Sequence, residues 1–245
     1  MLFDALVALV GIIAGGIASL TGFGIGSLLT PLFAYRVATK LAVAAVSIPH
    51  FAATAYRFWL LRKSVDRRTL ISFGITSAAG GLVGALLNAY SSNPALTLTF
   101  GVILVFVSLS EFTGLVQRMR FSGPIAWLAG AVSGLLGGLV GNQGGIRSAA
   151  LLGFDLNKEA FVATATAIGV VVDFARMPVY IITEGRDLLS LWLPIAIAIV
   201  ATIVGTTLGK RYLVRLPQRV FRQTVASLLL LLGAYMLLKG FGLVL

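Results

Sequence analysis

Long apolar stretches follow one another along the whole chain, separated by short polar breaks. Eight such segments can be drawn, at 2–35, 40–61, 69–89, 94–116, 122–153, 159–183, 188–208 and 220–243. A membrane-spanning helix needs about 20 apolar residues, and a succession of this many such segments has no counterpart in soluble proteins. The pattern therefore predicts an all-α integral membrane protein.

The first and fifth segments differ from the other six because glycine-rich breaks interrupt them. The first break reads LTGFGIG at 20–26, and the second reads VGNQGGI at 140–146. Each break is followed by an arm of about 10 residues, which covers only half of the hydrocarbon thickness. We expect the chain to turn back at each break, so that 2–35 and 122–153 form re-entrant hairpins.

The breaks recur at similar places in two halves, 1–117 and 118–245, which we expect to be repeats within one membrane domain. The matches are Gly24 with Gly144 at a separation of 120, and Ser47 with Thr166 and Arg57 with Arg176 at 119. One small gap reconciles the two separations. A broken hairpin plus three helices in each half is typical of transporters built from inverted repeats.

The distribution of basic residues favours this topology. Of the 19 Lys and Arg, 3 lie within apolar segments and 16 lie in loops or at segment ends. If all eight segments cross fully, the 16 divide equally between the two faces. If segments one and five are re-entrant, 12 lie on one face and 4 on the other, as the positive-inside rule expects. Both termini are then periplasmic. Full crossing of segments one and five remains the alternative.

Composition excludes several function classes. The chain has no Cys and one His, so disulfides, thiolate metal sites and paired histidine ligands are not expected. Signatures of hydrolases, metalloproteases and nucleotide-binding loops are absent, and we expect neither an enzyme nor a cofactor. The net charge of +11 is explained by anionic lipid at the cytoplasmic face rather than by nucleic acid. The start lacks a basic region, so the first segment is expected to be retained.

The two breaks are also the candidate substrate site. A helix that starts after each break, near Ser27 and near Ile146, presents free amides and a positive dipole end, which favour an anion. Close packing of helices is the alternative role of these glycines. The candidate substrate-binding residues are Thr21, Gly22, Phe23, Gly24, Gly26, Asn142, Gln143, Gly144, Gly145 and Arg147. Arg147 could instead reach the membrane surface or pair with Asp173.

Four further ionisable residues lie inside apolar segments and are candidates for coupling or gating: His50, Arg57, Asp173 and Arg176. Asp173 and Arg176 are three residues apart on one helical face, which predicts an ion pair. The functional alternative makes Asp173 a proton carrier. His50 either packs against a carbonyl or titrates, and Arg57 either lines the path or extends to the cytoplasmic surface.

These features together resemble the sulfite exporter TauE/SafE family, also called the toluene-sulfonate uptake permeases. The matching stretches are Gly15 to Pro31 and Gly134 to Gly153, followed by the alanine- and threonine-rich Ala42–Ile48 and Ala163–Ile168. The second break departs from the commoner glycine triplet through Asn142 and Gln143, which makes it more polar.

The resemblance implies a transporter of sulfur-containing anions, of the sulfite or organosulfonate type, in the bacterial inner membrane. We expect alternating access of a small anion to either side, with proton coupling as an option. A passive anion channel and a transporter of carboxylates are the alternatives. The expected partners are the anion and the lipid bilayer, with no nucleic acid; a homodimer is one option for the oligomeric state.

Overall fold

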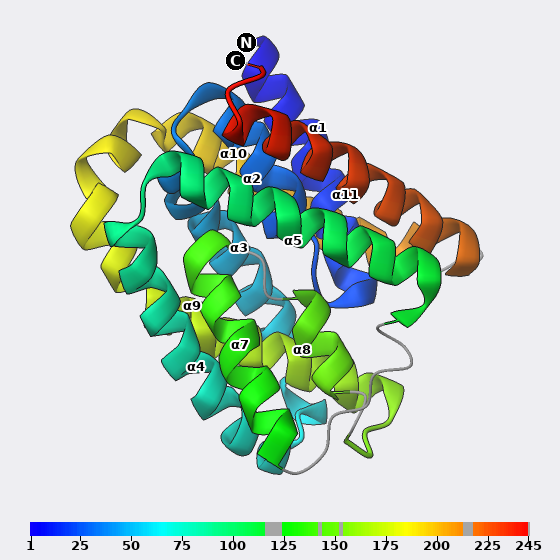
Figure 1. Ribbon diagram of the computed structural model, residues 1–245. Coiled ribbons are helices and arrows are strands. Elements are labelled where there is room, and N and C mark those ends of the chain that lie inside the picture. The colour runs from blue at the N-terminus through cyan, green and yellow to red at the C-terminus, as the bar shows by residue number, and fades with distance from the viewer. Residues whose placement is uncertain (116–123, 142–143, 152–153, 213–217, 245) are drawn as a thin grey trace.

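Helices account for the secondary structure of the part of the chain that the computed structural model describes: residues 1–115, 124–141, 144–151, 154–212 and 218–244. They are α1 (Leu2–Thr21), α2 (Ile25–Arg36), α3 (Thr39–Leu61), the short 3-10 helix η1 (Arg62–Ser64), α4 (Arg67–Tyr90), α5 (Asn93–Thr113), α7 (Pro124–Val140), α8 (Gly144–Leu151), α9 (Lys158–Ser190), α10 (Trp192–Tyr212) and α11 (Gln218–Gly240). No strand occurs among these residues. The expected all-α class is therefore confirmed, and Figure 1 shows that both termini lie at one end of the molecule.

The described helices have the size and composition of membrane-spanning segments. Five of those in the described ranges, α1, α4, α5, α9 and α10, are long and apolar enough to cross a bilayer, and α7 and the apolar part of α11 are shorter. Large apolar side chains are exposed on their outer faces, for example Leu9, Val102 and Val200. In water such a surface would cause aggregation, whereas in lipid it is the expected exterior. This is a multi-pass membrane protein.

Each of the main helix pairs combines one helix from residues 1–117 with one helix from residues 118–245. α1 packs on α10 and α4 packs on α7, while α5 lies along α11 and α3 along α9 (Figure 1). Small residues permit the close approach. A Cβ on Gly15 would lie 2.2 Å from the Thr202 carbonyl oxygen of α10, and one on Gly134 would lie 1.9 Å from the Ser77 carbonyl oxygen of α4. Glycine therefore serves helix packing at these two positions, as membrane interfaces require.

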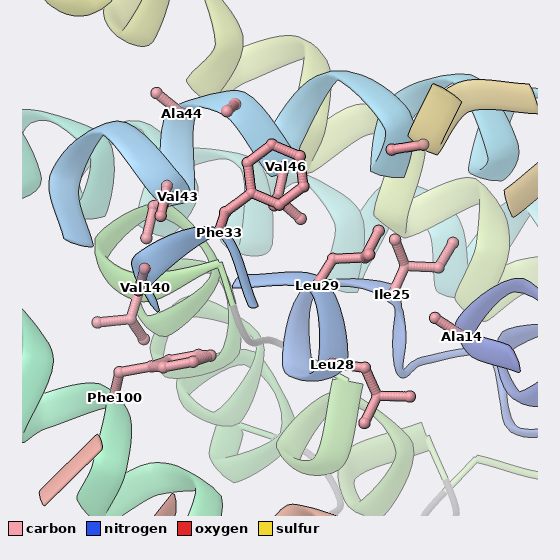
Figure 2. Packing of buried hydrophobic residues seen from close by; sticks show 14 of the residues in the cluster. Ala14, Ile25, Leu28, Leu29, Phe33, Val43, Ala44, Val46, Phe100 and Val140 are labelled. Atoms are coloured by element: carbon pink, nitrogen blue, oxygen red, sulfur yellow. The ribbon is translucent and has the colours of Figure 1, made fainter. Parts of the chain in front are cut away.

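The short helix α2 lies inside the molecule rather than against lipid. Ile25, Leu29 and Phe33 are at most 1% exposed, and Figure 2 shows them among side chains from α1, α3, α5 and α7. Val43 and Val140 of this cluster come from different halves of the chain. Because α2 is enclosed by protein, the non-helical backbone that precedes it is also shielded from lipid, which is the condition for irregular backbone at membrane depth.

One expected boundary is wrong. The segments 159–183 and 188–208 were predicted with a polar loop between them, but α9 continues through this stretch as one helix of 33 residues and ends at Ser190. Nothing between 184 and 187 stops a helix, since a single glycine is tolerated. The buried Leu188 and Leu191 keep the extension packed against the protein. α10 accordingly starts at Trp192 and runs to Tyr212.

Candidate anion site

The two breaks have the same backbone conformation at the helix ends that precede them. Gly22 ends α1 with φ 80°, and its N–H donates to the Ala18 carbonyl at 2.9 Å. Gly141 follows α7 with φ 77°, and its N–H donates to the Gly137 carbonyl at 3.0 Å. Glycine adopts this left-handed conformation without steric penalty, which is why both helices end here.

This geometry corrects the expected match between the breaks. Gly22 and Gly141 are 119 residues apart, as are the starts of α2 and α8 at Ile25 and Gly144. The pairing of Gly24 with Gly144 at 120, and the gap that it required, are therefore wrong. A single separation of 119 applies to the glycines of the two breaks, to the starts of α2 and α8, and to the starts of α3 and α9.

The two breaks pack directly against each other. A Cβ on Gly26 would lie 2.2 Å from the Gly141 carbonyl oxygen, and a Cβ on Gly144 would lie 1.9 Å from Cβ of Phe23. The Phe23 amide donates to the Thr21 hydroxyl at 3.2 Å, so this amide is already satisfied. Gly24, in the same loop, has φ 129°.

Of the candidates in the second break, Gly145 lies in the first turn of α8, and Asn142 and Gln143 lie outside the described residues. The breaks thus meet, as the sequence predicted, but backbone and Phe23 fill the space between them.

Arg147 projects from α8 into the protein and is 2% exposed. Its Nη2 donates to the Gly22 carbonyl at 3.0 Å, which links the second half to the first break. Its Nε and Nη1 are buried and have no hydrogen-bond partner among the described residues. The alternative in which Arg147 reaches the membrane surface is wrong, because the side chain is enclosed. A buried guanidinium with unsatisfied donors is costly, and an anion beside it would lower that cost.

Asp173 is the centre of a buried cluster between α3 and α9. Its Oδ1 accepts from Nε of Arg176 at 2.9 Å and lies 2.8 Å from Nη2 of the same residue. Its Oδ2 lies 2.6 Å from Nδ1 of His50. The predicted ion pair with Arg176 is confirmed. Of the two alternatives for His50, packing against a carbonyl is not what Nδ1 does, because α3 and α9 pack face to face and bring the imidazole to the carboxylate.

Arg57 and Arg176 both close the end of a helix that precedes a break. Arg57 Nη1 donates to the Ala18 carbonyl at the end of α1, and Arg176 Nη1 donates to the Gly137 carbonyl at the end of α7. Each carbonyl also accepts from the glycine amide four residues later, so the arginine adds a second hydrogen bond to a carbonyl at the helix end. Arg57 is 4% exposed and also donates to the Thr166 hydroxyl at 3.1 Å. It does not extend to the surface.

Two participants were not anticipated. Tyr180, one helical turn beyond Arg176, donates its hydroxyl to the Gly138 carbonyl. Thr54 on α3 is 1% exposed, and its hydroxyl has no hydrogen-bond partner in the protein. The sequence contained a signal for Thr54: it lies three residues before Arg57, and the residue 119 positions after it is Asp173.

Positive charge exceeds negative charge in this buried region. Among the described residues, the buried Lys, Arg, His, Asp and Glu side chains are Arg57, Arg147, Arg176, Asp173 and His50. Three guanidinium groups face a single carboxylate, and His50 adds no negative charge in either protonation state. No group of three or more His, Cys, Asp or Glu that could hold a metal occurs in the residues described. The excess of buried positive charge favours an anion at this place.

Broken helices that meet inside a multi-pass bundle, next to buried ionisable side chains, define the class of membrane transporters. The chain belongs to the sulfite exporter TauE/SafE family, whose model matches residues 7–236. The comparisons with curated proteins and with solved structures give no match. The resemblance inferred from the glycine breaks is therefore confirmed over nearly the whole chain. Membership makes this a transporter of the sulfur-anion exporter type.

Proposed function

We propose that this protein is a secondary transporter that moves a small sulfur-containing oxyanion, of the sulfite or organosulfonate type, across the bacterial inner membrane by alternating access. The observation that carries the proposal is Arg147: a guanidinium that is 2% exposed, with Nε and Nη1 free of partners among the described residues. An isolated buried charge costs several kcal/mol, and an oxyanion that accepts from the guanidinium reduces that cost.

Alternating access follows from two repeats, which we place at 1–117 and 118–245. Three features support them. Arg57 with Ala18 and Arg176 with Gly137 form the same hydrogen bond 119 residues apart. α3 and α9 start at equivalent positions, Thr39 and Lys158. α1 corresponds to α7, and α4 corresponds to α10, by their order within each half. The packing of α1 on α10 therefore has its counterpart in the packing of α7 on α4.

We further propose that the repeats are inverted and that their hairpins are re-entrant, with both termini periplasmic. The support is the 12-to-4 distribution of loop Lys and Arg. The length of α1 does not discriminate, because α1 alone could cross a bilayer. Maleimide labelling of single cysteines at Ala38, which is exposed, and Ser91 tests this topology: labelling from the periplasmic side supports it, and labelling only from the cytoplasm overturns it.

In this mechanism the amides of the two breaks complete the anion site when the halves rock apart. The residues given this role are Thr21, Gly22, Phe23, Gly24, Gly26, Asn142, Gln143, Gly144 and Gly145, besides Arg147. His50 and Asp173, 2.6 Å apart, would carry a coupling proton, and Arg57 and Arg176 would hold the helix ends during the movement.

Uptake of labelled anions into proteoliposomes tests the function. The panel holds sulfite, a short organosulfonate, a carboxylate of similar size and chloride. We expect saturable uptake of the sulfur anions, and accumulation against their gradient when a pH gradient is imposed. Non-saturating flux that never accumulates would instead indicate a passive channel. A preference for the carboxylate would remove sulfur from the proposal.

Arg147→Gln tests the site, with Arg186→Gln as the control because Arg186 is an exposed cation. Loss of charged hydrogen bonds worth about 2–3 kcal/mol should weaken anion affinity roughly 100-fold in Arg147→Gln. Arg186→Gln should stay within about twofold of the wild type, because exposed charges contribute little. Equal affinity of Arg147→Gln and wild type would refute the assignment of Arg147.

A further inference from the structure

The two halves differ at the positions that surround their equivalent arginines, and this difference locates the anion more closely. The inference rests on the proposed function. In the second half, Arg176 is joined to Asp173, three residues earlier, and Asp173 is joined to His50 of the facing helix. Guanidinium, carboxylate and imidazole form a complete buried set, in which the negative charge is supplied by the protein.

In the first half the same set is incomplete. The residue three before Arg57 is Thr54, which is the counterpart of Asp173 at a separation of 119. The counterpart of His50 is Gly169 on α9. The first-half set therefore has the hydroxyl of Thr54 in place of the Asp173 carboxylate. It has Gly169, which carries no side chain, in place of the His50 imidazole. The Thr54 hydroxyl is buried and has no protein partner.

Arg147 reaches the space that the missing imidazole leaves. A Cβ on Gly169 would lie 3.1 Å from Arg147 Nη1 and 3.2 Å from Cγ2 of Thr54. The unpartnered Nη1 of Arg147 and the side chain that carries the unpartnered hydroxyl therefore meet at Gly169. Arg57 adds a second positive charge, and the charges of Arg57 and Arg147 repel each other. Two guanidinium groups are thus present at the first-half position, which has neither the carboxylate nor the imidazole of the second-half set.

We propose that the transported anion binds at this position and replaces the carboxylate that the first half lacks. Its oxygens would accept from Nη1 of Arg147 and from the Thr54 hydroxyl. The ligand class is a small oxyanion with at least two oxygens on one atom, because two separate donors, one charged and one neutral, face this position. Sulfite, sulfonate and carboxylate share this chemistry, whereas a halide does not.

Thr54→Asp tests the proposal by building the missing carboxylate into the protein. The introduced charge should occupy the anion position, so we expect anion affinity to fall roughly 100-fold or more, the size of losing a charged hydrogen-bonded pair. Thr54→Asn is the matched control, because asparagine has the shape of aspartate and no charge. Its anion affinity should fall by no more than about tenfold. Similar losses in the two variants, or wild-type affinity in Thr54→Asp, would overturn the proposal.

Thermal unfolding without any anion gives a second readout that does not depend on transport. Thr54→Asp should unfold at a higher temperature than Thr54→Asn, because its charge compensates Arg147 and Arg57. Sulfite should then raise the unfolding temperature of the wild type but not that of Thr54→Asp. A lower unfolding temperature for Thr54→Asp than for Thr54→Asn would contradict the position assigned to the anion.

Gly169→Ala tests the position assigned to the anion if Thr54→Asp does not fold. Its methyl group would press on both Arg147 and Thr54, and anion affinity should fall about tenfold, as expected for an overpacked contact. Gly185→Ala is the control on the same helix, since nothing lies within 4 Å of the added methyl. Unchanged affinity in Gly169→Ala would overturn the proposal.

The outcomes distinguish a failure of the proposed function from a failure of the position assigned to the anion. If the wild type neither binds nor transports any member of the anion panel, the proposed function fails, and the anion-free unfolding temperatures still test whether this position favours a negative charge. If the wild type transports sulfur anions but the Thr54 and Gly169 variants match their controls, the function stands and the position is wrong.

Discussion

The helices α3 and α9 carry equivalent arginines in unlike surroundings. On α9, Arg176 is paired with Asp173, and His50 completes the set. On α3, Arg57 has carbonyl and hydroxyl acceptors among the described residues, and Thr54 lies 119 residues before Asp173. The charge of Arg176 is therefore compensated by a carboxylate, whereas Arg57 is paired with none in the described part of the chain. This difference is the basis for proposing that one arginine serves structure and that the other lies beside a ligand.

The strongest test of this contrast compares Asp173→Asn with Thr54→Val. Asp173→Asn leaves Arg176 buried without its counter-charge and should destabilise the protein by about 3–5 kcal/mol. Thr54→Val removes a hydroxyl that has no protein partner and should change stability by less than about 1 kcal/mol. Thermal or denaturant unfolding in detergent measures both. Comparable losses at the two positions would mean that the two helices are not functionally distinct.

The contact between the two breaks offers a test of intermediate size. In Gly26→Ala the added methyl would lie 2.2 Å from the Gly141 carbonyl oxygen, which is backbone and cannot move aside cheaply. We expect a loss of about 3 kcal/mol from overpacking. Gly185→Ala should be neutral or slightly stabilising, because its methyl meets open space and alanine favours the helix. A Gly26→Ala protein as stable as Gly185→Ala would show that the breaks do not touch.

The smallest expected effect concerns two helix caps, one in each half. Asp66 accepts from the Thr69 amide at 2.7 Å at the start of α4, and Asn157 accepts from the Ala160 amide at 2.9 Å at the start of α9. Replacing either residue by alanine should cost about 1 kcal/mol at pH 7. Unfolding temperatures of the two variants and the wild type, recorded as a function of pH, measure these costs.

Only the Asp66 cap should depend on pH. Hydrogen bonds from Thr69 hold the pKa of Asp66 below its usual value. The folded state thus favours the ionised form, and the stabilisation is present above the unfolded pKa and lost as pH falls through the lower folded pKa. The cost of Asp66→Ala should therefore shrink below about pH 4. The cost of Asn157→Ala should stay constant, and a parallel decline in both would exclude the carboxylate as the cause.

Much of the fold could be predicted from local pattern. Apolar runs predicted the helices, because a bilayer requires a continuous apolar surface and internally satisfied backbone. The glycine clusters correctly marked the breaks. The boundary between α9 and α10 was missed because the polar stretch at 184–187 looks like a loop, while its helix is maintained by packing of Leu188 and Leu191. Such packing involves residues that are distant along the chain.

The candidate site was predicted only in outline. The pair of Asp173 with Arg176 follows from a spacing of three residues on one helix, so the sequence sufficed. The partner of His50 lies 123 residues away, and the acceptor for Arg147 lies 125 residues away. Local spacing contains no information about either contact. The role suggested for Thr54 needed both the repeat separation and the knowledge that its hydroxyl is unpartnered.

By itself, then, the sequence determined that this is a helical membrane protein with two breaks and an internal ion pair, because each of these depends on neighbouring residues along one segment. Only the tertiary structure decided which buried charges are compensated. Compensation depends on distances of a few ångströms between segments that are more than 100 residues apart. Arg176 forms an ion pair with a carboxylate and Arg147 forms none among the described residues, although both are arginines in apolar segments.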